Sequence, residues 1–459
     1  MSQANPSMSL SNPHPAHFNG MQKTGLAITA IGLFAVLLAC TGLAMHQSLI
    51  LLLLCIVGFF AGGAIYAYGT YGNIPEGIKN NRTMFSSMSS HGALAWIAGI
   101  VITAFYILLY WREYWTKVFG TDLLSGLVAM FDPLSRAIRQ KPADQWFLYG
   151  SFYTIAVLVM GFKFILKYRH NTYQIIRTCS VMTIQLGLAW LLPAIMLRLK
   201  DFEPYLSYFW PLDYDALFPG TLSYFKSHPS GLGTFVIFWG LVMTFVATPI
   251  LTYFFGKRWY CSWFCGCGGL AETAGDPFRH LSDKSLKAWK VERWLIHSVL
   301  AAIVLITALL LFDNAVHNKL LGVAWAKGLA HWYGFAIGMV FSGVVGVGFY
   351  PIMGSRVWCR FGCPMAAYMG LIQRFKSRFR ITTNGGQCIS CGNCSTYCEM
   401  GIDVRWYAQR GQNIVRASCV GCGICSAVCP RGVLKLESGP DTDSRLNSFF
   451  SSEDLKILS

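Results

Sequence analysis

The chain has 459 residues, of which 54% are hydrophobic and only 13% are charged. Soluble globular domains carry roughly 25% charged residues, so this composition excludes an ordinary soluble enzyme and is typical of a polytopic membrane protein. The formal net charge is +16, but the basic residues lie in short loops beside apolar segments, where they orient membrane helices, and we expect no nucleic-acid binding.

Long apolar runs account for most of the shortage of charge. Residues 1–24 form a polar tail rich in Pro and Ser, for which we expect no ordered structure. Eight runs that are each long enough to cross a bilayer follow it: 25–44, 48–69, 93–111, 145–166, 179–198, 232–255, 294–312 and 329–351. The sequence therefore predicts a mainly α-helical membrane domain of about eight spans over residues 25–380, embedded in a lipid bilayer.

The distribution of basic residues predicts the orientation of these spans. The loop 163–177 contains four Lys or Arg residues and no acidic residue, and residues 354–380 contain six and none. The loop 256–293 contains seven basic and four acidic residues. The positive-inside rule then places these loops and both termini in the cytoplasm. We expect a multi-pass protein of the bacterial inner (cytoplasmic) membrane.

Two long cysteine runs follow the last span, in a polar segment of residues 381–436. We expect this segment to form a separate two-cluster ferredoxin-like domain, and residues 437–459 to form a C-terminal tail. Both runs have the spacing C-x2-C-x2-C-x3-C: Cys388, Cys391, Cys394 and Cys398, then Cys419, Cys422, Cys425 and Cys429. This is the bacterial two-cluster ferredoxin run, in which the fourth cysteine ligates the other cluster. Structural zinc fits poorly, because a zinc site takes four ligands in total.

The run predicts two [4Fe–4S] clusters with exchanged fourth ligands. The first takes Cys388, Cys391, Cys394 and Cys429, and the second takes Cys419, Cys422, Cys425 and Cys398. Gly392, Gly421 and Gly423 are expected to let the loops wrap closely around the clusters. Glu399 stands where a proline often follows the fourth cysteine. That proline shapes the turn and is not a ligand, so the prediction of clusters does not depend on it.

A shorter cysteine pattern occurs twice, after the sixth span and after the eighth. Gly256–Cys265 and Gly354–Cys363 both read G-x-R-x-x-C-x3-C, which predicts an internal repeat. The repeat thiols are Cys261, Cys265, Cys359 and Cys363, and Cys267 is a weaker fifth candidate. C-x3-C spacing puts two thiols on one helical face, which suits a third cluster or metal ion, a redox-active dithiol, or structural thiols. Arg258 and Arg356 either stabilise a thiolate there or anchor the loops at the membrane.

At these residues the sequence resembles the NapH/NosR-type membrane polyferredoxins, which include the quinol-dehydrogenase subunit of periplasmic nitrate reduction and the nitrous-oxide-reductase maturation protein. The resemblance rests on the two C-x3-C motifs, Trp259–Cys265 and Trp358–Pro364, followed by the two ferredoxin runs. It covers about residues 232–436 and implies electron transfer between the quinone pool, or another membrane donor, and a partner redox protein. Cys265-Gly266-Cys267 departs from the Cys-Pro ending of that family, and the spans of residues 25–166 have no counterpart in it.

The sequence thus predicts a membrane iron–sulfur protein that relays electrons between a cytoplasmic or quinone-level donor and a partner redox subunit. Such a protein would be the electron-transfer subunit of an oxidoreductase, for example a quinol dehydrogenase. Two alternatives stay open: a metallo-assembly factor whose repeat thiols reduce or hand over copper for oxidase maturation, and a membrane anchor with structural clusters. A quinone is a candidate cofactor. A b-type haem is not expected, because we interpret the histidines near the spans as interfacial: His46, His91, His297, His317 and His331.

Overall fold

The computed structural model describes residues 18–42, 44–72, 89–200, 202–227, 231–317 and 322–439. Most of the two expected tails, residues 1–17 and 440–459, lies outside these ranges. Within the described residues, eight helical segments are long and apolar enough to cross a membrane: Gly20–Cys40, Gln47–Tyr71, Ala93–Tyr110, Gln145–Lys167, Thr172–Leu199, Leu232–Phe255, Leu286–Ala315 and Ala324–Val345. The predicted mainly helical fold with eight spans is confirmed.

The chain folds into two compact units that each combine separate stretches of sequence. The first unit contains residues 1–207, 264–278 and 339–355, and the second contains 208–263, 279–338 and 356–459. The helices η4 (Asp276–Leu281) and η5 (Gly334–Val345) each begin in one unit and end in the other. Each unit is described by itself.

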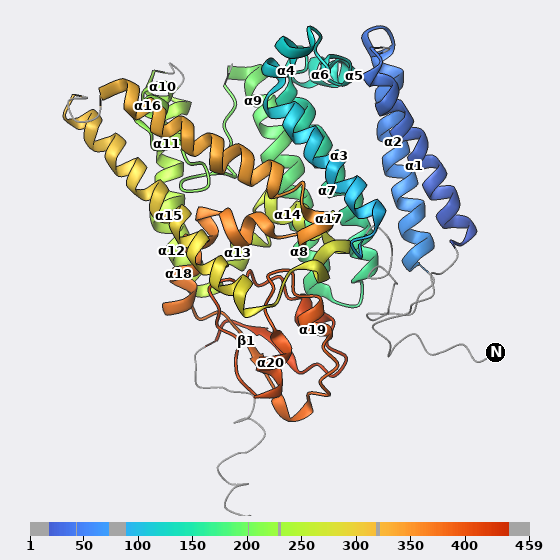
Figure 1. Cartoon of the computed structure of the whole chain (residues 1–459), viewed down its shortest axis with the longest axis vertical. Coiled ribbons are helices and arrows are strands. Elements are labelled where there is room, and N and C mark those ends of the chain that lie inside the picture. Colours follow the sequence, from blue (N-terminus) through green and yellow to red (C-terminus); the bar gives the residue numbers. More distant parts are fainter. Residues whose placement is uncertain are drawn as a thin grey trace, which may run out of the picture. The chain divides into compact units, whose positions relative to one another are not determined.

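The first unit holds five of the spans (Figure 1). They are α1 (Gly20–Cys40), α2 (Ala44–Tyr71), α3 (Ala93–Tyr110), α7 (Gln145–Lys167), and a continuous helix made of α8 (Thr172–Ile184), η2 (Gln185–Leu191) and α9 (Leu192–Lys200). Three short helices gather at one end of α3 and α7: α4 (Arg112–Phe119), α5 (Ser125–Met130) and α6 (Asp132–Arg139). The unit also contains α14 (Gly266–Thr273) and α17 (Tyr350–Met353).

Small residues and caps explain how these helices form and pack. A Cβ atom added at Gly58 of α2 would lie 2.6 Å from the Cα of Gly32 of α1, so only glycine permits this close approach of two spans. The Asp144 carboxylate accepts hydrogen bonds from the backbone N–H groups of Trp146 and Phe147, at 2.9 and 2.8 Å, and so caps the start of α7. Local sequence and packing therefore agree on where these spans begin and touch.

Buried ion pairs tie the segment 264–278 to the spans of the first unit. Lys167 Nζ donates to a carboxylate oxygen of Asp276 over 2.7 Å, and both side chains are buried. Arg177 forms a second buried ion pair with Glu272. Two of the basic residues that set the predicted orientation are therefore also structural partners of acidic residues in a later loop.

The second unit holds three spans and the ferredoxin segment. Its membrane helices are α11 (Leu232–Val242), η3 (Met243–Ala247) and α12 (Thr248–Phe255), which form one span, then α15 (Leu286–Ala315) and α16 (Gly322–Tyr333), which continues into η5. Shorter helices are α10 (Pro219–Lys226), α13 (Arg258–Cys261), η6 (Trp358–Gly362) and α18 (Pro364–Phe375). The Ser285 hydroxyl accepts a hydrogen bond from the Ala288 N–H, 3.1 Å, and caps α15.

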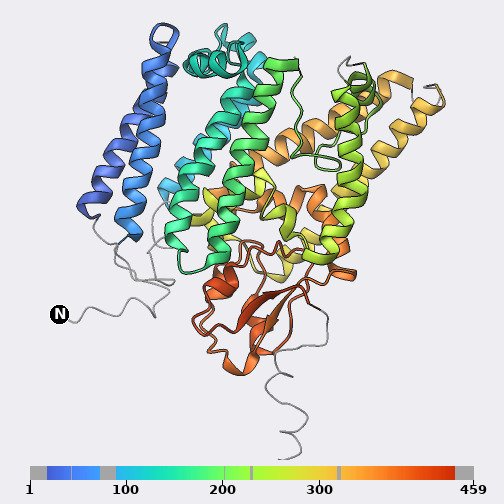
Figure 2. The same ribbon diagram turned by 180° about the vertical axis from the view of Figure 1, so that it is seen from behind.

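The ferredoxin segment closes on itself through a two-stranded antiparallel sheet. The strand β1 (Arg380–Thr383) pairs with β2 (Leu434–Glu437), so that Arg380 lies opposite Glu437. Between the strands lie η7 (Gly385–Gln387), α19 (Asn393–Thr396), α20 (Val404–Gln409) and α21 (Ile424–Ala427). Figures 1 and 2 show this segment at the end of α12 and at the start of α15, on one side of the spans of this unit.

Candidate iron–sulfur sites

The two ferredoxin runs adopt the same backbone path. Gly392 and Gly423 occupy the same position in their runs, have φ values of +80° and +76°, and precede the short helices α19 and α21. Two residues earlier in each run stand Ser390 and Gly421, with φ values of +57° and +64°. The left-handed region is readily adopted by glycine and rarely by other residues. The sequence spacing is thus realised as two matching loops, with Ser390 the non-glycine exception.

One set of four thiols surrounds a small cavity in the ferredoxin segment. Its lining includes the four cysteines predicted for the first cluster, Cys388, Cys391, Cys394 and Cys429, together with apolar side chains such as Ile389 and Leu434. Burial raises the pKa of the Cys394 thiol to about 12, and negative charge on the other three cysteines adds to the increase. Because iron binds thiolates, such a thiol loses its proton when a positively charged cluster binds there.

The other four thiols form a second group. Burial raises the pKa of the Cys425 thiol, and negative charge on Cys422, Cys419 and Cys398 raises it further, which places these sulfurs within electrostatic reach of one another. Burial likewise raises the pKa of Cys419 to about 11. Cys429 therefore lies with the first three cysteines of the other run around the small cavity, and Cys398 lies within electrostatic reach of Cys419 and Cys425. Both donor sets consist of four sulfurs, of which Cys394, Cys419 and Cys425 are buried and Cys391 is exposed. Four sulfur donors fit a [4Fe–4S] cluster.

Glu399, the residue at which the first run departs from the usual pattern, joins the ferredoxin segment to the rest of the second unit. Its side chain is 1% exposed and forms ion pairs with Arg279, at 2.7 Å, and with Arg356, at 3.0 Å. The Ser282 hydroxyl donates to its backbone oxygen over 2.7 Å. A buried carboxylate that faces two buried arginines is stable only while all three are present, so Glu399 replaces the turn proline with a structural anchor.

Neutral hydrogen bonds extend this attachment. The Gln373 side-chain amide on α18 donates to the backbone oxygens of Arg416 and Cys419, both over 2.7 Å, and accepts from the N–H of Lys257 over 2.6 Å. The Ser262 hydroxyl donates to the backbone oxygen of Val420 over 2.9 Å. The loop that carries the second group of thiols is therefore fixed to segments that follow two of the spans.

Two of the repeat cysteines meet at one arginine. Arg356 Nη1 lies 3.6 Å from the sulfur of Cys359 and donates to the backbone oxygen of Cys261 over 3.3 Å. Cys261 and Cys359, the first cysteines of the two C-x3-C motifs, are both buried. The guanidinium group thus favours a thiolate at Cys359 and links the two copies of the repeat within the second unit.

The remaining thiols of the repeat have different surroundings. Cys363 precedes α18, and its sulfur accepts from the N–H of Ala366 over 3.4 Å. Cys265 and Cys267 belong to the first unit, where Cys265 is buried and precedes α14. Cys267 lies within electrostatic reach of Tyr106 and Tyr110 of α3. Arg356 therefore contacts the sulfur of Cys359 and the backbone of Cys261, and two tyrosines lie within electrostatic reach of Cys267, which the spacing did not predict.

Comparison with known proteins identifies ferredoxin-type domains in the chain. A family model described as a 4Fe-4S binding domain matches residues 237–285 and 335–382, and a model described as a 4Fe-4S dicluster domain matches residues 387–434. The first model matches both copies of the repeat. It associates both C-x3-C motifs with iron–sulfur binding and does not favour the copper-assembly alternative.

One relative is similar to part of the chain. The "Putative electron transport protein YccM" of Escherichia coli (strain K12) is 28% identical over 174 residues, which cover 36% of this chain and 46% of the relative. The chain thus spans about half the length of the curated relative it matches. No solved structure matches the chain significantly.

Proposed function

We propose that this protein transfers electrons through two [4Fe–4S] clusters in the ferredoxin segment, between a membrane donor and a partner redox protein. The observation that supports this proposal is that Cys429 shares one small cavity with Cys388, Cys391 and Cys394, while Cys398 lies within electrostatic reach of Cys419 and Cys425. A [4Fe–4S] cluster accepts and returns one electron. The chain's own residues hold the cluster positions, limit contact with water and fasten the ferredoxin segment to the spans through Glu399.

The repeat cysteines are proposed to hold a third cluster. Each copy of the motif contributes two thiols, and a cubane needs four ligands, so the two copies complete one site and neither suffices alone. The contacts of Arg356 with Cys261 and Cys359 support a site that both copies share. For Cys265, the proposal rests on the sequence repeat and on the matching 4Fe-4S family model.

A quinol is the proposed donor. In the second unit, a cavity of about 480 Å³ beside α15 and α16 is lined by apolar residues and by six polar or charged side chains: Tyr214, Asp215, Thr221, Asp313, Lys327 and His331. A quinol headgroup needs apolar walls together with groups that accept its protons. Asp313→Asn and His331→Gln are expected to slow cluster reduction by quinol, while reduction by dithionite stays unchanged. Equal losses with both reductants would count against a quinol site here.

We infer that the ferredoxin segment lies in the cytoplasm of a bacterium, within or beside its inner membrane. Residues 354–380 carry six basic and no acidic residues, and Arg374, Lys376 and Arg378 are exposed, as the positive-inside rule requires of cytoplasmic residues. A reporter fused after Ser459 should be active only in its cytoplasmic form. Activity of a periplasmic reporter at that position would reverse the orientation.

An iron and sulfide count tests the central proposal. Protein purified without oxygen should contain about eight iron and eight acid-labile sulfide per chain for two clusters, and about twelve of each if the repeat cysteines hold a third. Cys391→Ser should remove about four iron atoms, and a Cys40→Ser control should remove none. Zinc in place of iron, without sulfide, would contradict the proposal.

A further inference from the structure

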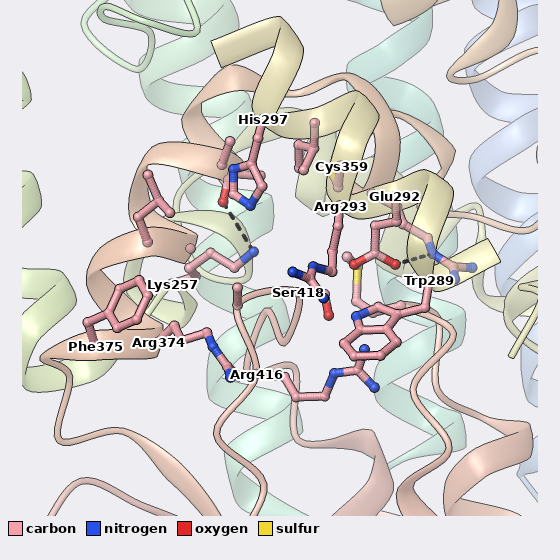
Figure 3. A pocket seen from close by; sticks show the side chains of 18 residues that line it. Lys257, Trp289, Glu292, Arg293, His297, Cys359, Arg374, Phe375, Arg416 and Ser418 are labelled. Carbon is pink, nitrogen blue, oxygen red and sulfur yellow. Dashed lines mark hydrogen bonds and ion pairs between the residues drawn. The ribbon is translucent and has the colours of Figure 1, made fainter. Parts of the chain in front are cut away.

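A second cavity of the second unit, of about 210 Å³, is lined by side chains of which only Cys359 has a role in the function proposed above. Its wall combines side chains from the first turns of α15, including Trp289 and Arg293, with Arg374 of α18, Lys257 and residues 416–418 (Figure 3). These segments are far apart in the sequence. The cavity is therefore a product of the fold and not of one local motif.

The lining of this cavity is strongly positive. It contains five Lys or Arg side chains, Lys257, Arg293, Arg360, Arg374 and Arg416, together with one carboxylate, Glu292, and the thiol of Cys359, a proposed cluster ligand. Glu292 is already occupied, because it accepts from Arg360 Nε over 2.7 Å. Among the described residues, no carboxylate forms an ion pair with any of the other four. The fixed charges of the protein leave this cavity with an unbalanced positive charge.

The buried ammonium group of Lys257 is the strongest indication that an anion binds in this cavity. Lys257 is 1% exposed, and its ammonium group donates to the backbone oxygen of Ala366 over 3.3 Å. A carbonyl oxygen carries only a partial charge, and burying an ammonium group is costly unless an anion is close. An anion in the cavity would supply the missing partner.

The arginines are held in place before any ligand arrives. The guanidinium carbons of Arg293 and Arg416 lie 5.3 and 4.6 Å from the ring centroid of Trp289, within the range of a cation–π contact. Figure 3 shows both groups beside the indole ring. A planar guanidinium fork binds phosphate through two parallel hydrogen bonds. Phosphate is therefore the anion that best matches this arrangement.

Exposed aromatic rings indicate where the phosphate comes from. Phe375, next to Arg374, is 71% exposed, and Trp294, next to Arg293, is 79% exposed. Trp294 belongs to the spanning helix α15, and large exposed rings at the ends of spans lie in the membrane interface. A phosphate that binds between these residues would be attached to apolar chains, as basic pockets between membrane helices recognise lipid headgroups.

We propose that this cavity binds the phosphate group of an anionic membrane phospholipid, with Lys257, Arg293 and Arg374 as its ligands. A competing role is to balance the negative charge of the nearby thiols. Burial raises the pKa of Cys419, while the positive charges of Lys257 and Arg416 act in the opposite direction. Arg293 and Arg374 are exposed, and the basic residues that act most on Cys419 are Lys257 and Arg416. Substitution of Arg293 and Arg374 therefore separates lipid binding from charge balance.

The test compares two double variants of the purified, cluster-containing full chain. Arg293→Gln with Arg374→Gln removes two cavity charges. Lys287→Gln with Lys290→Gln removes two charges from exposed residues of α15 that do not line the cavity. Bound lipid is measured by native mass spectrometry after titration with phosphatidylglycerol or phosphatidylcholine. Inorganic phosphate is added in a parallel series, and the cluster midpoint potentials are recorded.

We expect the parent protein to bind phosphatidylglycerol in preference to phosphatidylcholine. The affinity for phosphatidylglycerol should be at least about tenfold weaker in the cavity variant, and within about twofold of the parent in the control variant. Equal weakening in both variants would indicate general surface attraction and overturn the proposal. If inorganic phosphate binds tightly and phosphatidylglycerol is not preferred, the phosphate in the cavity does not come from a lipid, and the proposal is wrong. If the cavity variant has altered midpoint potentials but unchanged lipid binding, the basic residues of the cavity only balance the charge of the thiols, and the proposal is wrong.

Discussion

Arg258 and Arg356 occupy the same position in the two copies of the repeat, yet they have different surroundings. Arg356 is 1% exposed and contacts the sulfur of Cys359 and the carboxylate of Glu399. Arg258 is half-buried, lies 5.1 Å from the ring centroid of Phe379, and donates to the hydroxyl of Ser438 over 2.9 Å. One arginine faces a candidate cluster ligand, whereas the other packs against the ends of the ferredoxin segment.

This difference shows that the two copies of the repeat share the backbone conformation at the start of the turn but not the contacts of their side chains. Gly256 and Gly354 both have positive φ values, +64° and +95°, so both copies turn alike after their spans. The neighbouring residues then diverge. Glu399 supplies a buried anion to the second copy, whereas Phe379 and Ser438, which flank the sheet, give the first copy an aromatic ring and a hydroxyl group.

The largest expected effect comes from removing the anion that distinguishes the second copy. Glu399→Ala leaves Arg279 and Arg356 buried without their carboxylate, which should cost about 3–5 kcal/mol and sharply lower the yield of folded protein. Glu399→Pro should be equally damaging, although proline is usual at this position in ferredoxins. Fluorescence-detected size exclusion and iron content measure the outcome. Near-normal yield of either variant would show that the ion pairs are dispensable.

The next effect tests whether the two copies share one metal site. Cys261→Ser and Cys359→Ser should each lower the iron content by about four atoms per chain, because loss of one ligand from either copy opens the same cluster. The double variant should lose little more, since the two residues act as one unit. Iron losses that add up in the double variant would show that the copies bind metal separately.

Much of the architecture follows from regular sequence patterns, whereas the contacts between distant segments do not. Apolar runs predicted the spans because a bilayer requires about 20 apolar residues for each helix. Cysteine spacing predicted the two groups of thiols because the ligands of each loop are local. Glu399 was visible as a departure from the pattern, but its partner Arg279 lies 120 residues away. No spacing rule connects the two, and the same holds for Lys257 and the anion cavity.

A third test compares the two arginines directly. Arg356→Met should destabilise the protein by about 3 kcal/mol, because it leaves Glu399 with one partner fewer in a buried site. Arg258→Met should cost about 2 kcal/mol, the combined value of two cation–π contacts, with Phe255 and Phe379, and one hydrogen bond. Apparent melting temperatures in one detergent rank the two variants. Only Arg356→Met should also shift a midpoint potential, and equal effects would remove the distinction between the copies.

The comparison with the smallest expected effect, that of Ser390→Ala, begins where Arg258 of the first copy touches the ferredoxin segment. Gly421 has a φ of +64°, and a Cβ atom there would lie 2.6 Å from the Cβ of Arg258. Gly421→Ala therefore combines backbone strain with a contact that the arginine stem must relieve, and it should cost about 2 kcal/mol. Ser390, at the matching position of the other run, already has a positive φ of +57°, so Ser390→Ala should change stability by about 0.5 kcal/mol or less. Arg258→Ala keeps its own Cβ atom and so leaves the contact in place, whereas Arg258→Gly removes it. Gly421→Ala should therefore lower the melting temperature less in the Arg258→Gly background than in the Arg258→Ala background. Equal losses in the two backgrounds would show that the strain is confined to the backbone of the ferredoxin loop.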